Sequence, residues 1–329
     1  MIYIETKSVH PWTNLAFEEY FLRNLDLGDD ILMLWQNEPT IVVGRFQNTL
    51  EEINQDYTDT HGIHVIRRIS GGGAVYHDLG NLCFSFILHG ITTGMVDASR
   101  FARPVVQALA QFGIQAEVSG RNDLTIDGKK FSGNAMALQK QRLLFHGTLL
   151  YDTDLNVLGD ALRVAPDKIE SKGVKSVKSR VTNIKSYAPK DLTIQQFKET
   201  LKHFLLDGSE SQEYFPTSQD LGGIQQLVEQ KYQSWDWNFG SNPSSNVFYA
   251  RRFSGGKIEA HLEIEKGYLQ SCQFTGDFLG LCELDEVEQR LVGVRYTKQD
   301  VENALADVEF KKYFGLVSRE EVIACMMGL

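Results

Sequence analysis

The stretch of sequence best suited to chemistry is a run of glycines directly after two arginines. Residues 67–78 read Arg-Arg-Ile-Ser-Gly-Gly-Gly-Ala-Val-Tyr-His-Asp. Glycines let a backbone approach a ligand closely with its N–H groups pointing outward, and paired arginines can clamp a carboxylate or a phosphate. The same residues also suit a plain glycine hairpin beside surface arginines. Because the stretch lacks both the P-loop pattern and the G-x-G-x-x-G dinucleotide pattern, any nucleotide held here is bound by another route.

A second candidate segment, residues 119–135, combines an amide, a carboxylate and two lysines. Asn122 offers an amide suited to the edge of a base or a ribose, and Asp123 offers a ligand for a hydroxyl group or a metal. Alternation along the strand places Lys129 and Lys130 on opposite faces, so only one of them can point into a site. A lysine in a hairpin is otherwise more often solvated than catalytic.

Histidine and cysteine offer weaker signals. His146 sits in a strand-like run, where a lone histidine is more often structural than catalytic, and no serine or cysteine lies close to it in sequence. Cys83 falls on the face of strand 82–88 opposite the bulky apolar residues, which favours a buried, inert thiol. None of the four cysteines forms a C-x-x-C pair, so neither a zinc ribbon nor a disulfide framework is indicated.

Charge is distributed unevenly along the chain. The 329 residues carry a formal net charge of −10, which argues against a general polyanion binder, because nucleic-acid affinity comes from clustered positive charge. Residues 163–190 nevertheless contain eight basic and two acidic side chains, a local charge of +6 that leaves −16 for the rest. This segment is either a loop that closes over an anionic ligand or a loop that is simply solvated.

The elements expected to position these residues are short strands with a few helices among them. Apolar alternation and β-branched runs predict strands, and apolar residues at helical spacing predict helices. The predicted strands are residues 2–5, 31–36, 40–45, 65–69, 82–88, 124–126, 130–132 and 143–151, and the predicted helices are residues 14–26, 99–112 and 193–206. Many hairpins and few β-α-β alternations indicate an α+β fold with mixed or antiparallel sheets.

A polar, turn-forming cluster at residues 241–245 marks the expected boundary between two domains. Strands are predicted after it at residues 247–253, 257–264 and 268–275, followed by helical segments. We therefore expect one domain at residues 1–241 and a smaller one at 246–329. The N-terminus lacks the pattern of a signal peptide and no apolar run approaches ~20 residues, so we expect a cytoplasmic protein without a membrane span.

Five segments together resemble the signature of the lipoate–protein ligase family. They lie in the family's order at compatible spacing, which is far more specific than any one of them alone. They are Arg-Arg-x-Ser-Gly-Gly-Gly-Ala-Val-Tyr-His-Asp-x-Gly-Asn at 67–81, Ser-Gly-Arg-Asn-Asp at 119–123, Lys-x-Ser-Gly-Asn-Ala at 130–135, His-Gly-Thr-Leu-Leu at 146–150 and Ser-Arg-Val-Thr-Asn at 179–183. Trp-Asp-Trp-Asn-Phe-Gly at 235–240 also fits the family, so the resemblance covers essentially the whole chain.

The resemblance implies a large α+β catalytic domain, similar to those of biotin ligases and octanoyltransferases, and a small α+β accessory domain. It also implies a two-step reaction. Lipoate and ATP give lipoyl-AMP and pyrophosphate, and a lysine of an acceptor lipoyl domain then attacks the activated carbonyl and releases AMP. ATP and Mg²⁺ are the implied co-substrate and metal, with the ion held mainly through the phosphates.

The family motifs, matched residue by residue, imply individual roles. Lys130, rather than Lys129, takes the catalytic position, where a fixed cation lowers the barrier to bringing a carboxylate and an α-phosphate together. The residues implied to hold ATP or the adenylate are Arg68, Gly73, Ala74, Val75, Tyr76, Asn122, Asp123, Lys130, Arg180, Val181 and Thr182, with Asp123 also a candidate Mg²⁺ ligand. The residues implied to hold lipoate are Gly72, His77, Lys130, Ala135 and His146. Candidates for the wall of its apolar slot are Leu15, Phe17, Val43, Gly44 and Ala135.

The implied partners are the lipoyl domains of 2-oxoacid dehydrogenase complexes or the H protein of glycine cleavage, modified by a monomeric enzyme; neither nucleic acid nor membrane is expected as a partner. Two alternatives stay open. An octanoyl- or lipoyl-transferase of the same superfamily would need a cysteine nucleophile, and no cysteine lies near His146. A non-catalytic relative that only binds lipoate or lipoyl domains would not need Lys130, which is present.

Overall fold

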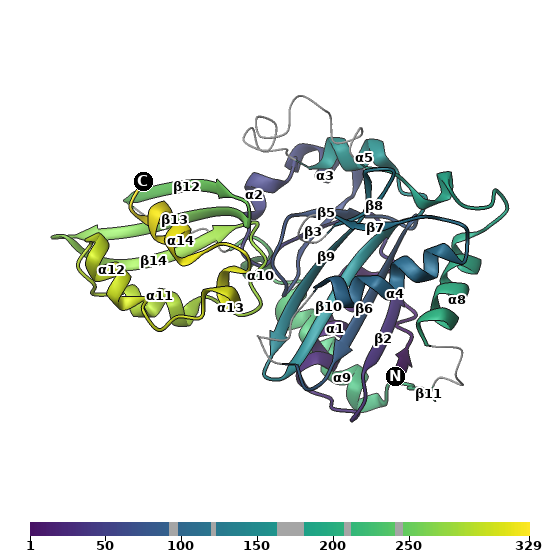
Figure 1. The fold of residues 1–329 in the computed structure, drawn as a ribbon. Helices are drawn as coiled ribbons and strands as arrows, with labels where there is room; N and C mark the ends of the chain where they lie inside the picture. Colours follow the sequence, from purple (N-terminus) through teal and green to yellow (C-terminus); the bar gives the residue numbers. More distant parts are fainter. Residues whose placement is uncertain (92–97, 120–122, 163–180, 207–211, 241–245) are drawn as a thin grey trace.

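The computed structural model describes residues 1–91, 98–119, 123–162, 181–206, 212–240 and 246–329. Within them the chain forms a large body built on an eight-stranded sheet and a small C-terminal body (Figure 1). The strands of the large sheet, in spatial order, are β11 (Gln212–Glu213), β1 (Ile2–Ile4), β2 (Ile31–Trp35), β6 (Asn81–Leu88), β10 (Arg142–Leu150), β9 (Lys129–Gln139), β8 (Asp123–Ile126) and β7 (Glu117–Ser119). β1 runs parallel to both of its neighbours, and the pairings from β2 to β7 are antiparallel, so the predicted α+β fold with mixed sheets is confirmed.

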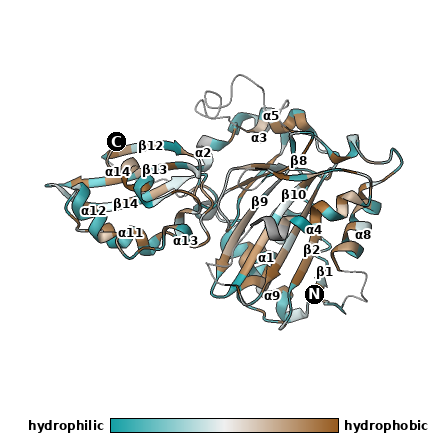
Figure 2. Ribbon diagram, viewed as in Figure 1, coloured by the Kyte–Doolittle hydropathy of each residue, from teal (hydrophilic) through white to brown (hydrophobic). Residues whose placement is uncertain are grey.

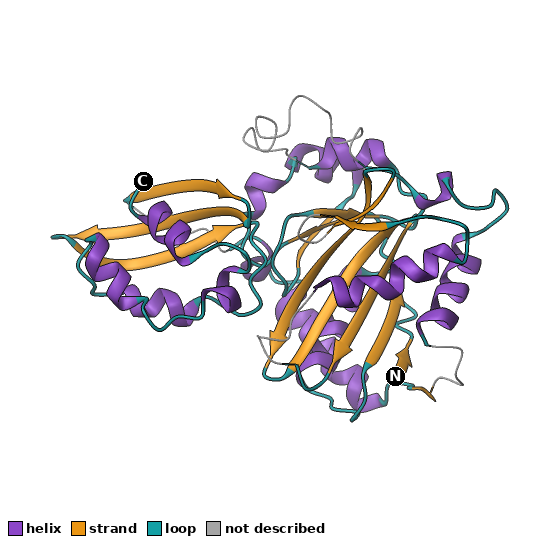
Figure 3. Ribbon diagram, in the orientation of Figure 1, coloured by secondary structure: helices purple, strands orange, loops and turns teal. Residues whose placement is uncertain are grey.

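Helices cover both faces of this sheet (Figures 1 and 3). They are α4 (Ala98–Ala110) and α8 (Ile194–Leu205) on one face, and α1 (Pro11–Arg23) and α9 (Ser218–Leu227), which continues as a π-helical turn (Val228–Tyr232), on the other. Strand β6 therefore buries apolar residues on both faces: Leu82 and Phe84 join the cluster beneath α4 and α8, while Cys83 and Ile87 join the cluster beneath α1. Its neighbour β2 is coloured as hydrophobic in Figure 2. No helix in the described residues combines the length and apolar character needed to cross a bilayer.

Local signals explain where the helices begin. Pro11 opens α1, where its missing N–H costs no hydrogen bond, and Thr193 caps α8 in a capping box with Gln196. Pro104 lies inside α4, which begins at Ala98.

A second, three-stranded sheet holds the glycine-rich loop, residues 68–74. Its strands, in spatial order, are β4 (His64–Arg67), β3 (Thr40–Val43) and β5 (Val75–His77), and the short helices beside it are α2 (Thr49–Glu52), α3 (Gln55–His61) and α5 (Leu155–Ala161). β4 is parallel to β3 and β5 is antiparallel to it, so the chain must reverse between β4 and β5. The glycine-rich loop makes that reversal. The sequence did not predict β5, which begins directly after the glycines.

The C-terminal body packs four helices against a three-stranded antiparallel sheet (Figure 3). Its elements are β12 (Val247–Phe253), β13 (Gly256–Glu265), β14 (Tyr268–Gly276), α11 (Asp285–Leu291), α12 (Lys298–Ala304), α13 (Phe310–Phe314) and α14 (Arg319–Met326). Ile258, Ala260 and Leu262 alternate along β13 and share one apolar cluster with Val322 and Ile323 of α14. The three strands lie where the sequence predicted them.

The two bodies touch at the glycine-rich loop and at the edge of β9. Gly72 N–H donates to the Phe278 carbonyl oxygen at 3.0 Å, and Leu138 N–H donates to the Leu281 carbonyl oxygen at 2.8 Å. Arg45 adds an ion pair, with 2.7 Å between its Nη2 and Oε2 of Glu283. These contacts join the C-terminal body directly to the backbone of the loop.

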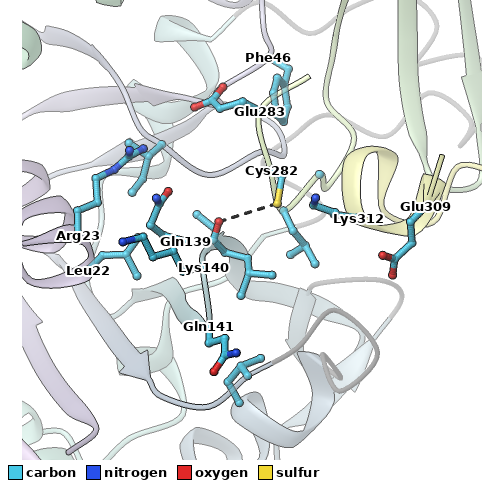
Figure 4. A pocket seen from close by; sticks show the side chains of 16 residues that line it. Leu22, Arg23, Phe46, Gln139, Lys140, Gln141, Cys282, Glu283, Glu309 and Lys312 are labelled. Atoms are coloured by element: carbon cyan, nitrogen blue, oxygen red, sulfur yellow. Dashed lines mark hydrogen bonds between the residues drawn. The ribbon is translucent and has the colours of Figure 1, made fainter. Parts of the chain in front are cut away.

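A cavity of about 420 Å³ lies at this contact (Figure 4). Its lining includes Leu22, Ile69 and Lys140 from the large body and Cys282 and Lys312 from the small one. The Cys282 thiol donates to the carbonyl oxygen of Leu138 at 3.9 Å across the cavity wall. The residues predicted to bind ATP or lipoate do not line this cavity.

The Gly71→Ala substitution is expected to loosen the contact between the two bodies. A Cβ at position 71 would lie 2.6 Å from the Phe278 carbonyl oxygen, which is rigid backbone, so one of the two segments must shift. We expect a loss of about 1–3 kcal/mol in unfolding free energy, typical of overpacking, measured by urea denaturation. Gly73→Ala is the matched control, because its Cβ would meet nothing within 4 Å. Equal stability of the two variants would contradict the prediction.

Candidate active site

Arg68 shapes the glycine-rich loop from within. The guanidinium is 5% exposed, and its Nη2 donates to the carbonyl oxygens of Gly71 at 2.7 Å and Gly73 at 2.9 Å. Its Nε donates to Ser70 Oγ at 3.0 Å. Burial lowers the Arg68 pKa to about 10, which still leaves a cation at neutral pH. The carbonyl oxygens of Gly71 and Gly73 therefore turn toward Arg68, and the Gly72 N–H is bonded to the Phe278 carbonyl oxygen.

Arg67, by contrast, cannot clamp a ligand, and the expectation that both arginines do so was wrong. Its side chain is 1% exposed and donates entirely to protein acceptors. Those acceptors are the carbonyl oxygens of Gly44, Arg45, Gln47, Trp237 and Asn238 and the hydroxyl of Thr49. Arg67 thus ties β4 to the start of α2 and to the short helix α10 (Trp235–Asn238), which carries the Trp-Asp-Trp-Asn motif.

The remaining loop residues divide into an outer and an inner group. Gly73, Ala74 and Val75 are partly exposed, as residues that meet a nucleotide should be. Gly72 is buried, and its φ of 90° falls in the region that favours glycine. Tyr76 is 3% exposed, and burial raises the pKa of its phenol, which is therefore neutral. Gly72 and Tyr76 support the loop from beneath.

Lys130 is held at a defined place near the start of β9. Its Nζ lies 2.8 Å from Asp123 Oδ1, and both side chains are 37% exposed. The same ammonium lies over Gly133, where a Cβ would come within 3.0 Å of it and displace it slightly. Lys129 is exposed and makes the pair with Ile126 in the hairpin. The choice of Lys130 as the site lysine is consistent with this geometry.

The segment after the basic loop returns to Lys130. Val181 bridges to Lys130 in parallel, and Thr182 N–H donates to the Lys130 carbonyl oxygen at 2.9 Å. Two of the predicted adenylate residues therefore lie directly beside the predicted catalytic lysine. Asn122, Arg180 and most of the basic segment, residues 163–180, lie outside the described residues.

His146 does have a hydroxyl partner, which sequence proximity did not reveal. Its Nε2 lies 2.6 Å from Ser70 Oγ of the glycine-rich loop, and its Nδ1 lies 2.9 Å from Oε1 of Glu18 on α1. Glu18 is 1% exposed, on the same helical face as buried Leu15 and Leu22. A carboxylate on an apolar helix face is rare without a partner, and that was the signal available in the sequence.

His77 lies nearby as a neutral imidazole. Burial, together with the charge of the Arg68 guanidinium, lowers the pKa of His77 to about 3. The Asn37 side-chain nitrogen lies 3.1 Å from Nδ1 of His77, so the amide donates to the ring. Cys83 lies 3.7 Å from the same Nδ1, is 1% exposed, and has its thiol pKa raised well above the ordinary value by burial. The predicted inert character of this thiol agrees with that environment.

Stability should consequently fall as the pH drops below about 6.5, the usual pKa of histidine. Between that pH and about 3, the unfolded chain binds a proton at His77 that the folded protein does not. We expect His77 to contribute up to about 1.4 kcal/mol of lost unfolding free energy per pH unit in this window. Urea denaturation of His77→Gln at several pH values should show a shallower decline, and a decline as steep as that of the unsubstituted protein would argue against the buried neutral histidine. Above pH 7 the two stabilities should differ by a constant.

The predicted lipoate wall is only partly assembled. Leu15 and Phe17 lie in the buried cluster between α1 and the large sheet, and Ala135 pairs with His146 across β9 and β10. Val43 belongs instead to the separate cluster under the small sheet. Gly44 faces the loop, because a Cβ there would lie 1.9 Å from the Gly72 carbonyl oxygen. The structure therefore groups Leu15 with Phe17 and places Val43 in a different cluster, while Ala135 and Gly44 belong to neither.

Asp123, the candidate Mg²⁺ ligand, is ion-paired with Lys130. Across the residues that the structure describes, no group of three or more histidine, cysteine, aspartate or glutamate side chains is arranged to hold a metal.

The site thus combines a partly exposed lysine on β9, a glycine-rich loop whose residues 73–75 are partly exposed, and a buried serine–histidine contact. The chain matches the family model for the lipoyl protein ligase A/B catalytic domain over residues 10–205 and that for the bacterial lipoate protein ligase C-terminus over residues 242–326. It is 42% identical to the lipoate-protein ligase LplJ of Bacillus subtilis, over 98% of this chain and 99% of that protein. The chain belongs to the lipoate–protein ligase family.

Solved structures agree. A lipoate-protein ligase A bound with ATP is 28% identical, with a TM-score of 0.62 over 73% of this chain and 97% of that chain. A bi-partite lipoate protein ligase of Thermoplasma acidophilum, described with its E2 lipoyl domain, is 30% identical, with a TM-score of 0.64 over 75% of this chain and 98% of that chain. Both are similar over the greater part of this chain.

Proposed function

We propose that this protein joins lipoate to a lysine of an acceptor lipoyl domain through a lipoyl-AMP intermediate. In the first step a lipoate carboxylate oxygen attacks the α-phosphorus of ATP and pyrophosphate leaves. In the second step the acceptor lysine amine attacks the lipoyl carbonyl and AMP leaves. The observation that carries the proposal is the placement of Lys130 beside Thr182 and Asp123, on the strand pair that also carries His146.

Lys130 is the proposed catalytic residue. A carboxylate and a triphosphate repel each other, and a fixed ammonium between them stabilises the charge that develops as they meet. The Asp123 carboxylate holds the ammonium in place before the substrates arrive.

The glycine-rich loop is the proposed seat of the ATP phosphates. Arg68 turns the loop carbonyls inward, and partly exposed Gly73, Ala74 and Val75 present backbone to the ligand. Mg²⁺ would accompany the phosphates and needs no direct protein ligand, since this ion usually keeps several waters and few protein contacts. Asn122 and Arg180 are proposed to complete the nucleotide site by their match to the family motifs.

Lipoate is proposed to lie between α1 and the large sheet, with its carboxylate toward Lys130. Leu15, Phe17 and Ala135 offer the apolar surface there, and His77 and His146 offer the polar end. The acceptors are proposed to be lipoyl domains of 2-oxoacid dehydrogenase complexes or the H protein. The enzyme is proposed to act as a cytoplasmic monomer.

Two measurements test the proposal. Pyrophosphate release should depend on lipoate, ATP and Mg²⁺ together, and incubation with an apo lipoyl domain should raise its mass by one lipoyl group. Absence of lipoate-dependent pyrophosphate release would overturn the proposed function. Release without any mass increase would overturn the choice of acceptor only.

A further inference from the structure

A chain of hydrogen bonds between buried polar side chains runs from the core of the large body to the glycine-rich loop. Trp35 Nε1–H donates to Ser85 Oγ at 2.8 Å, and the Ser85 hydroxyl donates to Glu18 Oε1 at 2.5 Å. The same Oε1 lies 2.9 Å from His146 Nδ1, and His146 Nε2 lies 2.6 Å from Ser70 Oγ. Glu18 is 1% exposed and Ser70 is 0% exposed. The proposed reaction steps do not use this series of hydrogen bonds.

The chemistry of the groups sets the direction of the bonds. A carboxylate only accepts hydrogen bonds, so His146 carries its proton on Nδ1 and donates a hydrogen bond to Glu18. Nε2 then accepts a hydrogen bond from the Ser70 hydroxyl. Ser70 Oγ also accepts from Arg68 Nε at 3.0 Å. Every link therefore has a defined partner, and the histidine ring cannot rotate without breaking two bonds.

This series of hydrogen bonds ends on the face of the large sheet that carries the Lys130 side chain. His146 and Thr148 are two residues apart on β10 and so share a face, about 7 Å apart along the strand. Gly133 N–H donates to Thr148 Oγ1 at 3.2 Å, and the Lys130 ammonium lies over Gly133. The His146–Ser70 bond and the ammonium thus occupy neighbouring positions on one face.

We propose that Glu18 is a positioning residue that acts through His146 and Ser70 to fix the glycine-rich loop relative to Lys130. The inference rests on the proposed function, because the loop and the lysine are the groups that meet ATP and lipoate there. Ser70 is tied at both ends, since its carbonyl oxygen also accepts from Arg45 N–H at 2.8 Å. A displacement of about 1 Å in such groups costs about 10²-fold in rate.

A single oxygen of Glu18 makes both hydrogen bonds. The effect of these bonds can therefore be tested separately from the effect of the negative charge. Oε1 accepts both the Ser85 and the His146 bond. Glutamine keeps a carbonyl oxygen with two lone pairs at that place, whereas leucine keeps the volume and loses the oxygen. The same Ser–His–Glu order serves nucleophilic catalysis in hydrolases, where the acid stabilises an imidazolium and an amide cannot. Ser70 has no exposed surface from which to attack a substrate.

The test compares Glu18→Leu with Glu18→Gln in the full-length chain, by lipoate-dependent pyrophosphate release at saturating ATP and lipoate. We expect kcat to fall about 10- to 100-fold in Glu18→Leu and within about threefold in Glu18→Gln, which keeps the hydrogen bonds. Ser70→Ala should lower kcat as much as Glu18→Leu does. The double variant should show no further loss of kcat, because both substitutions interrupt the same series of hydrogen bonds. Equal losses in the two Glu18 variants, no loss in Glu18→Leu, or additive losses in the double variant would each overturn the proposal.

Asp220→Asn is the matched control. Asp220 is also a buried carboxylate, 4% exposed, and it accepts from Tyr20 of α1 at 2.9 Å and from Tyr214 at 2.7 Å, away from the loop. We expect it to lower stability in urea while leaving kcat unchanged. A matching fall in kcat would show that loosening α1 alone slows the reaction, which would overturn the specific role of Glu18.

Hydrogen exchange separates this inference from the proposed function. Without substrates, the amides of residues 70–73 should exchange faster in Glu18→Leu than in the unsubstituted protein and in Glu18→Gln. Unchanged exchange would overturn the positioning role even in an active enzyme. A wild-type protein without lipoate-dependent pyrophosphate release would overturn the function instead. Should Glu18→Leu fail to fold, Ser70→Ala carries the same comparison.

Discussion

Replacing Lys130 with alanine is expected to slow lipoyl-AMP formation by about 10²–10³-fold while leaving the fold intact. The ammonium is fixed by Asp123 at 2.8 Å, yet the lysine side chain is 37% exposed and so can meet a ligand. Alanine removes the cation that reduces repulsion between the lipoate carboxylate and the α-phosphate. The loss should appear in kcat for lipoate-dependent pyrophosphate release, with an unchanged urea unfolding curve.

Lys129→Ala is the matched control for this prediction. The two lysines are neighbours in one strand, but Lys129 is exposed and pairs with Ile126 at the hairpin, whereas the Lys130 ammonium is ion-paired with Asp123. Its loss should leave pyrophosphate release at the wild-type rate. Transfer from pre-formed lipoyl-AMP to an apo lipoyl domain, measured in parallel, separates the two half-reactions. Full pyrophosphate release by Lys130→Ala would remove the lysine from its proposed role.

The sequence predicted the parts of the site that lie within contiguous motifs. Strand alternation limited the choice to Lys129 or Lys130, and family resemblance selected Lys130, which the structure places beside Asp123 and Thr182. The strands and the main helices follow from apolar periodicity, because both faces of the large sheet are covered by helices. The apolar alternation in residues 82–88 had indicated only one of those two buried faces.

What the sequence did not reveal depends on contacts between distant segments. Arg67 and Arg68 are adjacent and chemically alike, yet one ties together backbone segments and the other shapes the loop. Ser70 and His146 are 76 residues apart. Their contact depends on the fold, which places the glycine-rich loop after β4 next to β10. Likewise, the helix α1 brings Glu18 to His146 across 128 residues. No local pattern encodes such distances.

Arg67→Met is expected to destabilise the protein by about 4 kcal/mol or more. Methionine approximates the length of the side chain but supplies no donor, so the carbonyl oxygens of Arg45, Gln47 and Trp237 lose the guanidinium. Each buried acceptor left without a hydrogen bond costs about 1–3 kcal/mol. Since domains of this kind are stable by only about 5–15 kcal/mol, the variant should lie near the limit of folding. Urea denaturation at neutral pH measures the loss.

Arg103→Met, on the exposed side of α4, should change stability by no more than about 0.5 kcal/mol. Arg67→Lys should recover only part of the loss, because an ammonium has three donors and no planar fork to reach acceptors on two separate segments, residues 44–49 and 237–238. Burial lowers the Arg67 pKa to about 10, so the guanidinium is still charged at neutral pH and its bonds are charge-assisted. A loss below about 1 kcal/mol in Arg67→Met would show that the acceptors find other donors. A large loss would instead establish that Arg67 stabilises the segments around the glycine-rich loop, whereas Arg68 bonds the loop itself.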